Sequence, residues 1–414
     1  MKRNANFSPE LRFEIEKCSK CGKCLSVCPV YIETLDEKKV ARGRIALVEA
    51  LLDNELRYTD IVKESIQSCL KCLRCVDICI NDVRFDKIIT AIRESMPRKY
   101  GLSLINKIIF RHILPNRRLT NLLYRFGYYS QFLLPKRKGV LRHLPLMWSG
   151  RRSIPKLDRK SVLQKYGSDE KPVKNEKTVY FFTGCMFNYV ETRAAYSVIR
   201  IFNHFGYKVI VPKKQVCCGT PVLSVGDIKA AKSLAKRNIE TFKGDIPVIT
   251  ACASCGETLK HNYEYLLGED AHKFSARVFD FTEFIDKFIE FNPAVIGKTV
   301  IYHDPCHLRF GQGIHKEPRN LLKKSSNYVE TEGADYCCGM AGLFSVHHYP
   351  LAKKIARRKT DAMKKQKADL LVTECPGCII QLRDRFANDG VNIEVKHIAN
   401  LIEETLLADK SSQK

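Results

Sequence analysis

The sequence predicts a multidomain α+β protein: a helical N-terminal module with two metal sites, followed by two copies of an α/β unit built on a parallel sheet. Three observations predict this fold class. Two cysteine motifs of identical spacing lie before residue 80, and the stretch between them has helical spacing. Ten further cysteines form two sets of five at a nearly constant offset. Short apolar runs alternate with amphipathic stretches around each set, which is typical of a parallel sheet.

The composition predicts a protein with sizeable cores that needs an oppositely charged partner or surface. The 414 residues are 45% hydrophobic, carry a formal net charge of +25 and include 18 cysteines. The N-terminus "MKRNANFSPELRFEIEKC" lacks the apolar core of a signal peptide, and no run approaches the roughly 20 apolar residues of a membrane-spanning helix. We therefore expect a cytoplasmic protein without a transmembrane helix of its own. Its thiols stay reduced there and bind metal rather than form disulfides.

Two motifs near the N-terminus have the ligand spacing of paired iron–sulfur clusters. "CSKCGKCLSVCPV" and "CLKCLRCVDICIN" both fit C-x2-C-x2-C-x3-C, in which three thiolates bind one 4Fe-4S cube and the fourth reaches its neighbour. Zinc, the alternative, usually takes two separate C-x2-C pairs. Ile80 stands where the second motif would have proline, but this removes no ligand. The spacing assigns Cys18, Cys21, Cys24 and Cys79 to cluster 1, and Cys28, Cys69, Cys72 and Cys75 to cluster 2.

The residues around these motifs favour helices. In "ARGRIALVEALLDNELRYTDIVKESIQS" apolar residues recur at helical spacing from Ile45 to Leu52, and "FDKIITAIRESM" also predicts a helix. This region resembles the helical ferredoxin module of respiratory dehydrogenases rather than the small β-rich ferredoxin. We expect a helical ferredoxin-like domain with two 4Fe-4S clusters over residues 1–100.

A basic stretch without acidic residues follows. Residues 95–157 contain 14 Lys and Arg, no Asp or Glu, and eight interleaved aromatic residues. In "LSLINKIIFRHIL" apolar residues from Leu102 to Ile113 share one helical face, with Lys107 and Arg111 opposite. A solvated linker, a membrane or membrane-bound partner, and nucleic acid are three interpretations. We predict a basic amphipathic linker over 101–175 that docks on a membrane or partner, because such segments suit anionic headgroups and no nucleic-acid reader motif is present.

The remaining ten cysteines indicate a duplicated domain. Subtracting the members of one set from those of the other gives offsets of 121, 120, 120, 123 and 123. The first set is Cys185, Cys217, Cys218, Cys252 and Cys255, and the second set is Cys306, Cys337, Cys338, Cys375 and Cys378.

Each copy has the pattern of strands that alternate with helices. "TVYFFTGC" and "TVIYHDPC" are apolar runs that end in cysteine, and "PVITACASC" and "DLLVTECPGC" run into C-x2-C. "YVETRAAYSVIRIFNHFG" and "DIKAAKSLAKRNIETFKG" predict helices, the second with Asp227 as its N-cap. We expect all five cysteines of a copy at the carboxyl ends of parallel strands, where such sheets place their sites.

Five thiolates in one place indicate a site with more than one metal ion, since zinc or a single cube takes four. Gly219 and Gly339 supply the conformational freedom for the turn that follows each pair of adjacent cysteines. Two alternatives fit less well. A vicinal disulfide is strained, and a thioredoxin-like pair at Cys252 and Cys255 leaves the rest of its set without a role.

The pattern C-x31-CCG-x32-C-x2-C, repeated as C-x30-CCG-x35-C-x2-C, resembles the cysteine-rich CCG domain. That domain occurs in heterodisulfide reductases, in the glycolate oxidase iron–sulfur subunit, in the C subunit of anaerobic glycerol-3-phosphate dehydrogenase and in lactate-utilisation proteins. "ARGRIALVEALLDNE" and "CCGMAGLFSV" resemble the glycolate oxidase subunit, "TGCMFNY" the glycerol-3-phosphate subunit, and "YHDPCHLRFGQGIHKEPR" the D-type heterodisulfide reductase. The resemblance implies a first CCG domain over 176–290 and a second over 291–414. It also implies a noncubane 4Fe-4S cluster in each five-cysteine set, or zinc in one of them.

Four histidines lie near the second set, and no flavin or nicotinamide fingerprint accompanies them. His303 and His307 flank Cys306, while His347 and His348 follow the second CCG. We expect structural hydrogen bonds from all four. His303 and His307 become candidates for protonating a substrate thiolate only if the protein reduces a disulfide. No GxGxxG follows a predicted strand.

These observations predict an iron–sulfur electron-transfer subunit on the inner face of the membrane. The resemblance implies that an FAD-containing dehydrogenase subunit, of the glycolate/lactate or glycerol-3-phosphate type, supplies electrons that pass to a membrane quinone or cytochrome. The rival hypothesis is a heterodisulfide reductase catalytic subunit that reduces a disulfide at noncubane clusters. A zinc-stapled nucleic-acid binder fits the charge but not the cysteine spacing, so we expect no nucleic-acid partner.

Overall fold

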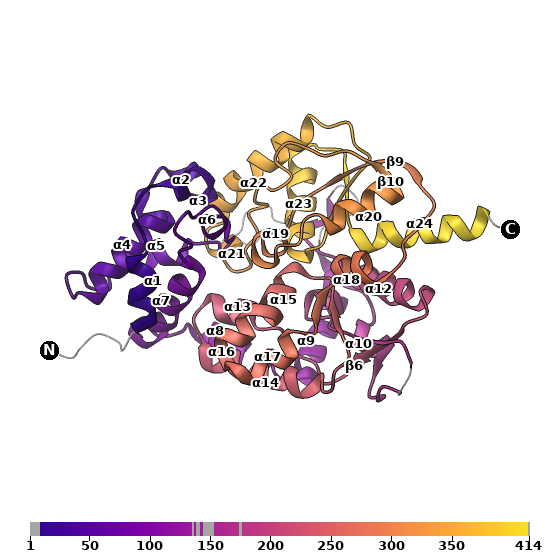
Figure 1. Ribbon diagram of the computed structural model, residues 1–414, viewed down its shortest axis with the longest axis horizontal. Helices are drawn as coiled ribbons and strands as arrows, with labels where there is room; N and C mark the ends of the chain where they lie inside the picture. Colours follow the sequence, from indigo (N-terminus) through magenta and orange to yellow (C-terminus); the bar gives the residue numbers. More distant parts are fainter. Residues whose placement is uncertain (1–8, 135, 138–140, 144–152, 174–175, 413–414) are drawn as a thin grey trace.

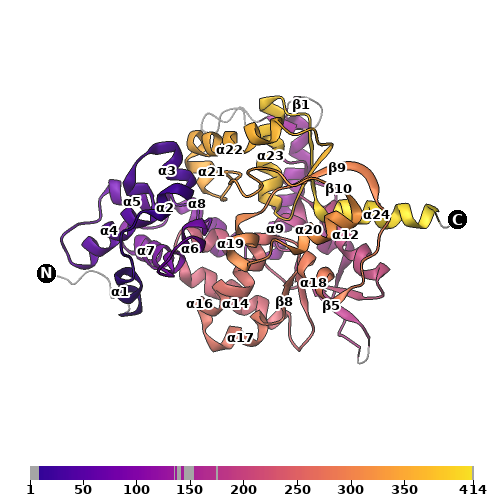
Figure 2. The ribbon, with the colours of Figure 1, turned by 45° about the horizontal axis from the view of Figure 1, so that its top comes forward.

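The computed structural model describes residues 9–134, 136–137, 141–143, 153–173 and 176–412 (Figure 1). Residues 9–100, called the N-terminal module below, contain helices and loops only, as the sequence predicts, and lie at one end of the molecule (Figures 1 and 2). The helices are α1 (Pro9–Glu16), α2 (Lys23–Val27), α3 (Pro29–Thr34), η1 (Glu37–Lys39), α4 (Ala41–Leu52), α5 (Asp60–Gln67), α6 (Arg74–Asp77) and α7 (Phe85–Tyr100).

The helices of the N-terminal module pack through apolar residues that recur on one face of each helix. Ile45 and Val48 of α4 lie in the same buried cluster as Ile88 and Ile92 of α7. The Thr59 hydroxyl accepts a hydrogen bond from the backbone of α5 and caps its N-terminus. Fully burying one aliphatic side chain stabilises the fold by about 1.5–3 kcal/mol, so this cluster fixes the helices that present the cysteine loops.

The next segment is more structured than a linker. Its elements are α8 (Leu104–Ile108), the π-helical turn η2 (Ile109–Ile113), α9 (Arg117–Ser130), η3 (Gln131–Leu133), the antiparallel strands β1 (Lys136–Arg137), β2 (Leu141–His143) and β3 (Ser153–Ile154), then α10 (Val162–Tyr166) and β4 (Gly167–Ser168). Of the apolar face expected from Leu102 to Ile113, Leu102, Ile109 and Ile113 are half-buried, whereas Ile105 is exposed. The turn widens after Ile108, which changes the register, so Phe110 is buried while Leu104 and Ile105 are exposed.

The first of the two large sheets is parallel, with strand order β4-β6-β5-β7-β8. Its further strands are β5 (Thr178–Phe181), β6 (Lys208–Pro212), β7 (Val248–Thr250) and β8 (Val278–Asp280). The helices around it are α11 (Met186–Tyr189), α12 (Thr192–His204), α13 (Thr220–Ser224), α14 (Ile228–Thr241), α15 (Ala253–Glu257), the π-helical turn η4 (Thr258–Asn262), α16 (Tyr263–Leu267), α17 (Glu269–Ser275) and α18 (Phe281–Phe288).

The second large sheet is also parallel and has strand order β10-β9-β11-β12. Its strands are β9 (Ile296–Tyr302), β10 (Ser326–Tyr328), β11 (Leu370–Thr373) and β12 (Glu394–His397). The helices are α19 (Cys306–Gln312), α20 (Glu317–Ser325), α21 (Phe344–His347), α22 (Tyr349–Lys364), α23 (Pro376–Asp389) and α24 (Ile398–Ser412). The order β6-β5-β7-β8 in the first sheet matches β10-β9-β11-β12, so the duplication inferred from the cysteines extends to the strand order.

One hydrophobic cluster spans both sheets, and a separate cluster includes Ile301 and Leu371 of the second sheet. Val179 and Val248 of the first sheet belong to the same buried cluster as Val300 and Val372 of the second. Helix α24, the last of the second copy, packs along α12 of the first, and the two run side by side in Figure 1. This shared core fixes how the two five-cysteine sets face each other.

Candidate iron–sulfur sites

Both N-terminal motifs turn the backbone in the same way around their middle cysteine. Lys20 and Gly22 flank Cys21, Lys71 and Leu73 flank Cys72, and all four flanking residues have φ between 53° and 85°. A left-handed conformation costs a residue other than glycine about 1–2 kcal/mol. The same costly shape in both loops indicates that the position of the thiols, not local stability, determines the backbone.

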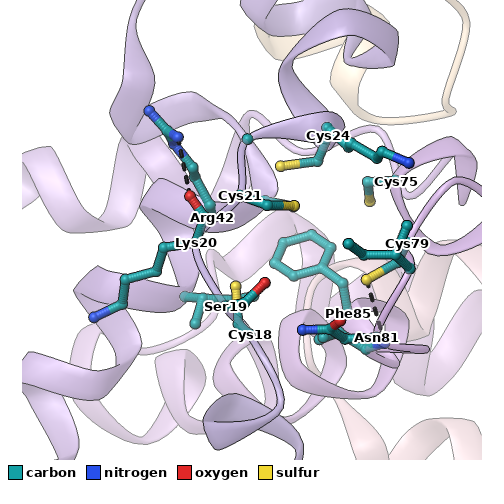
Figure 3. Close-up of a pocket in the computed structure, with 16 residues that line it drawn as sticks. Cys18, Ser19, Lys20, Cys21, Cys24, Arg42, Cys75, Cys79, Asn81 and Phe85 are labelled. Atoms are coloured by element: carbon teal, nitrogen blue, oxygen red, sulfur yellow. Dashed lines mark hydrogen bonds between the residues drawn. The ribbon is translucent and has the colours of Figure 1, made fainter.

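The first motif and the end of the second enclose one pocket, called the outer pocket below (Figure 3). The cysteines that line it are Cys18, Cys21, Cys24, Cys75 and Cys79, so the four assigned to cluster 1 lie together. The buried ring of Phe85 also lines it. The backbone N–H of Val83 donates to Cys79 Sγ at 3.4 Å, and Arg42 donates to the Lys20 carbonyl at 3.2 Å.

A second pocket, called the inner pocket, lies beside the outer one. Its cysteines are Cys28, Cys69, Cys72 and Cys75, the four assigned to cluster 2, and Cys75 lines both pockets. The backbone N–H of Lys71 donates to Cys69 Sγ at 3.4 Å. Burial raises the pKa of Cys72 to about 12 and raises that of Cys75 well above its usual value. Such thiols ionise only when a cation binds them, which fits a metal-ligand role.

Two buried arginines hold the loop that enters the inner pocket. Arg44 donates to the Ser65 carbonyl at 2.7 Å and to the Ser68 hydroxyl at 3.2 Å. Arg93 donates to the Cys69 carbonyl at 2.6 Å. Because both guanidinium groups lie on the main chain just before or at Cys69, they also place positive charge beside a site whose thiolates are negative.

The first set of five cysteines gathers beyond the carboxyl ends of β5, β6 and β7, as predicted from the alternating pattern. The Sγ atoms of Cys218 and Cys255 are 3.4 Å apart, and the neighbouring Cys217 thiol lowers the pKa of Cys185. Gly219 has φ of 99° and lets α13 begin directly after the adjacent cysteines.

The second set gathers in the same way beyond β9 and β11. The Sγ atoms of Cys338 and Cys378 are 3.2 Å apart, and the backbone N–H of Gly339 donates to Cys337 Sγ at 3.3 Å. Gly339 has φ of 80°, and a Cβ there would lie 2.5 Å from the Ala352 carbonyl oxygen. Only glycine fits this turn, so the CCG sequence of this copy is required by packing as well as by conformation.

All 18 cysteines are free thiols in the structure, so the vicinal disulfide has no support. Each set concentrates buried sulfur atoms, with one sulfur–sulfur distance of 3.4 Å in the first set and one of 3.2 Å in the second. Thiolate sulfur is the ligand that iron–sulfur clusters use, and N–H bonds to sulfur stabilise their negative charge. The residues present therefore fit the clusters that the cysteine patterns imply.

The inner pocket and the second set are neighbours. Helices α6 and α19 pack together, and Arg74 of α6 forms an ion pair of 2.8 Å with Asp335, two residues before Cys337. Cys28 and Cys72 of the inner pocket and Cys337 of the second set pack against one buried cluster. The pKa of the Cys306 thiol is raised by burial first and then by the negative charge of Cys72, which places these two thiols close together.

His307 lies at the point where three sites meet. Its Nε2 atom is 3.0 Å from the Lys71 carbonyl and must donate there, so Nδ1 accepts from the Ser254 hydroxyl at 3.0 Å. Lys71 adjoins Cys72, and Ser254 lies between Cys252 and Cys255. The structural role expected for His307 therefore agrees with its contacts.

The first and second sets lie next to each other. The Cys252 and Cys375 thiols lie close enough for each to shift the pKa of the other, and the Ser254 hydroxyl lies 3.8 Å from Cys375 Sγ. The backbone N–H of Ala253 donates to the Glu374 carbonyl at 3.0 Å. Sequence reasoning missed these links, although Ser254 could have been noticed inside its C-x2-C motif.

The other histidines occupy different positions. His303 is 1% exposed, and neither ring nitrogen has a hydrogen-bond partner among the described residues. His348 lies 3.7 Å from Glu64 of α5, and burial lowers its pKa. His347 ends α21.

Helix α9 presents its polar side to the protein and an apolar side to solvent. On the inner side, Arg117 donates to the Tyr189 hydroxyl and to the Gln215 carbonyl, which lies two residues before Cys217. Tyr124 donates to the Asp158 carbonyl, and Gln131 exchanges two hydrogen bonds of 3.0 Å with Leu157. The exposed residues of α9 and η3 include Leu122, Leu123, Phe126, Tyr129, Phe132 and Leu133, with Arg118 and Arg125 among them.

Two family models match the chain. The 4Fe-4S dicluster domain matches residues 14–83, and the cysteine-rich CCG domain matches residues 179–260 and 300–383. These ranges include both N-terminal motifs and all ten cysteines of the two sets. The N-terminal clusters are therefore of the 4Fe-4S type, as the cysteine spacing predicts.

The similarity to known proteins extends over nearly the whole chain. The probable glycolate oxidase iron-sulfur subunit of Bacillus subtilis is 30% identical over 94% of this chain and 93% of its own length. The D-type subunit of the dihydromethanophenazine:CoB–CoM heterodisulfide reductase of Methanosarcina acetivorans is 26% identical over 95% of this chain and 94% of its own length. The crystal structure of a hypothetical protein from Helicobacter pylori shares the fold, with a TM-score of 0.51 at 10% identity over 97% of this chain and 73% of that one.

Proposed function

Since this chain belongs to the family of iron–sulfur oxidoreductase subunits that join a 4Fe-4S dicluster domain to two CCG domains, we propose that its four cysteine sites form one electron relay. The relay connects an FAD-containing dehydrogenase subunit, of the glycolate/lactate or glycerol-3-phosphate type, with a membrane quinone or cytochrome. The ligands are Cys18, Cys21, Cys24 and Cys79 in the outer pocket, Cys28, Cys69, Cys72 and Cys75 in the inner pocket, and the five cysteines of each set. We propose 4Fe-4S cubes in the two pockets and a noncubane 4Fe-4S cluster in each set.

The observation that carries this proposal is that the four sites form an unbroken row. Cys75 lines both pockets, Cys72 lies close to Cys306, and Cys375 contacts Cys252. The order is outer pocket, inner pocket, second set, first set. When bound, iron–sulfur clusters at these positions exchange single electrons.

The residues of this chain contribute position and electrostatics. Backbone N–H groups of Lys71, Val83 and Gly339 donate to ligand sulfurs. His307 and Arg74 fix the distance between the inner pocket and the second set. The burial of the two sets excludes water, which strengthens each of these interactions.

We place the membrane acceptor beside α9. Arg117 connects the inner side of this helix to the loop before Cys217, so the exposed side lies near the first set, at one end of the row. On that side Phe126 is 73% exposed and Leu122 63%. A helix that turns apolar and basic residues outward suits an anionic membrane surface, and residues 95–157 contain no acidic residue to oppose it. None of the described helices is long and apolar enough to cross a bilayer.

The test combines metal content with electron acceptors. Anaerobically purified protein is expected to hold about 16 iron atoms and 16 acid-labile sulfides per chain, four of each at four sites. The protein is then reduced chemically and mixed rapidly with a water-soluble quinone, which is expected to reoxidise it on the timescale of stopped-flow mixing. Stoichiometric zinc with little iron, or no reaction with the quinone, overturns the proposal.

The contact between Cys252 and Cys375 favours one rival function. Two adjacent multi-metal sites can hold a disulfide between them, and the named activity of the Methanosarcina relative is heterodisulfide reduction. In that reaction two electrons and two protons convert the disulfide into two thiols as the S–S bond breaks. The same rapid-mixing experiment with CoB–CoM heterodisulfide distinguishes the two functions, because only the rival predicts fast reoxidation with release of thiols.

A further inference from the structure

The segments that lead into the two five-cysteine sets differ at several buried positions, and one of them lies directly after the strand of each copy. "TVYFFTGC" in the first copy aligns with "TVIYHDPC" in the second, which pairs Phe182 with His303. Both side chains are almost fully buried. A phenyl ring cannot donate a hydrogen bond, whereas a neutral imidazole has one N–H donor.

The imidazole of His303 is directed at the sulfur atoms of its own set. One ring nitrogen, Cys338 Sγ and Cys378 Sγ all lie within 4.8 Å of one another. Neither ring nitrogen has a partner among the described residues. Leaving a buried polar group unsatisfied costs about 1–3 kcal/mol, so the ring is expected to have an acceptor in the loaded protein. The two sulfur atoms meet that need.

Lys359 adds positive charge at the same place. Its buried ammonium donates to the carbonyls of Gly333 and Ala334 at 2.8 Å each, and it lies close enough to act electrostatically on Cys338 and Cys378. The second set therefore has polar groups beside Cys338 and Cys378. Any effect of His303 has to be measured with Lys359 kept in place.

We propose that His303 donates an N–H hydrogen bond to a ligand sulfur of the second set, at Cys338 or Cys378, and so raises the reduction potential of that site. The inference rests on the proposed function, because it needs an iron–sulfur cluster at the second set. A hydrogen bond to a ligand sulfur offsets the extra negative charge of the reduced state. The second set, in the interior of the row, then holds an electron more readily than it would with phenylalanine, and the duplicated sites are not equivalent.

The test is a redox titration of the anaerobic holoprotein followed by electron paramagnetic resonance. It uses a Cys218→Ser background, in which the signal of the first set is removed. His303→Phe copies the residue of the first copy and is expected to lower the reduction equilibrium of the second set at least tenfold, which is about 59 mV for one electron. His303→Gln, which keeps an N–H donor, is expected to retain most of the potential. Phe182→Leu is the matched control and is expected to leave it unchanged.

A second measurement identifies the hydrogen bond itself. With 15N-labelled histidine, pulsed paramagnetic resonance of the reduced second set is expected to detect a weakly coupled nitrogen that His303→Phe removes. An unchanged midpoint in His303→Phe at full iron content overturns the inference. Loss of iron from the second set overturns it too, since His303 is then a ligand. Little iron in the unsubstituted protein defeats the proposed function instead.

Discussion

Adjacent buried cysteines make each five-cysteine set sensitive to single substitutions. The adjacent thiol and burial raise the pKa of Cys217 in one set and of Cys337 in the other. The two sets approach each other at Cys252 and Cys375. Damage to one set is therefore expected to stay local.

We predict that Cys218→Ser removes the signal of the first set and Cys338→Ser that of the second, while the two ferredoxin-type signals remain. A serine hydroxyl is a poor substitute for a thiolate ligand of iron. Paramagnetic resonance and iron content of each variant, compared with the unsubstituted protein, measure this. Loss of the ferredoxin-type signals in either variant would show that the sites do not load independently.

His397 links the two copies and makes stability depend on pH. It lies fully buried, its Nε2–H donates to the Ala251 carbonyl at 2.9 Å, and Nδ1 accepts from the Ala399 N–H at 3.1 Å. Burial lowers the pKa of His397 to about 4, from 6.5 in an exposed histidine. The unfolded state thus binds the proton more tightly, so stability is lost as the pH falls from 6.5 towards 4.

Between pH 7 and pH 5.5 the predicted loss from His397 is about 1 kcal/mol. Thermal unfolding of the anaerobic protein at both pH values measures it. His397→Gln, which does not titrate, is expected to lose less stability over the same interval than the unsubstituted protein. Equal losses in the two proteins would mean that His397 is not the titrating group.

Residue-level prediction from the sequence succeeds where spacing carries the information. The cysteines that line each of the two pockets follow from the pattern C-x2-C-x2-C-x3-C, because short spacings restrict which thiols can come together. The buried His303 and the tautomer of His307 depend on contacts with residues far away in sequence, such as Cys378 and Lys71. No linear pattern contains those contacts.

Helix α9 exposes several large apolar residues, which indicates that a partner covers it. Its inner side is held by polar contacts from Arg117, Tyr124 and Gln131, so its outward apolar residues are not needed for the fold. An apolar stripe that faces solvent marks an interaction site in soluble proteins. The basic residues among them favour an anionic surface.

The double variant Leu122→Ser with Phe126→Ser is expected to bind phosphatidylglycerol vesicles at least tenfold more weakly than the unsubstituted protein. Each large apolar residue that enters the interface contributes about 1.5–3 kcal/mol. Leu407→Ser, at an exposed position of α24, is the matched control and is expected to bind normally. Cosedimentation at low and high salt measures the apolar and the electrostatic contributions to binding, and high salt is expected to weaken the binding. Full binding by the double variant, or equal binding to neutral vesicles, contradicts a membrane role for α9 and favours a protein partner.

The types of the secondary-structure elements could be predicted well from the sequence, but the side of a helix that is buried could be predicted less well. The alternation of apolar runs and amphipathic stretches predicts both parallel sheets, because each strand has to be covered by a helix before the next one. The burial of Phe110 could not be predicted, because Phe110 lies in a π-helical turn that begins at Ile109. Periodicity rules assume a constant 3.6 residues per turn, which this segment does not have.

At the scale of the whole molecule, the order of the sites in space differs from their order in the sequence. The second set adjoins the inner pocket, since α19 packs on α6, while the first copy reaches the N-terminal module through α13, which packs on α7. A sequence gives the number of sites and their ligands. The order depends on how the two copies dock through their shared core, which only the three-dimensional contacts define.

This order is the central claim, and electron transfer after a light flash tests it most directly. A ruthenium photosensitiser is attached to Arg12→Cys on α1, an exposed position of the N-terminal module. Flash photolysis of the holoprotein is expected to reduce the ferredoxin-type clusters first and the first set last. In Cys338→Ser, which interrupts the row at the second set, the first set is expected to stay oxidised on the same timescale while dithionite still reduces it. Reduction of the first set at an undiminished rate in Cys338→Ser would contradict a single row through the four sites.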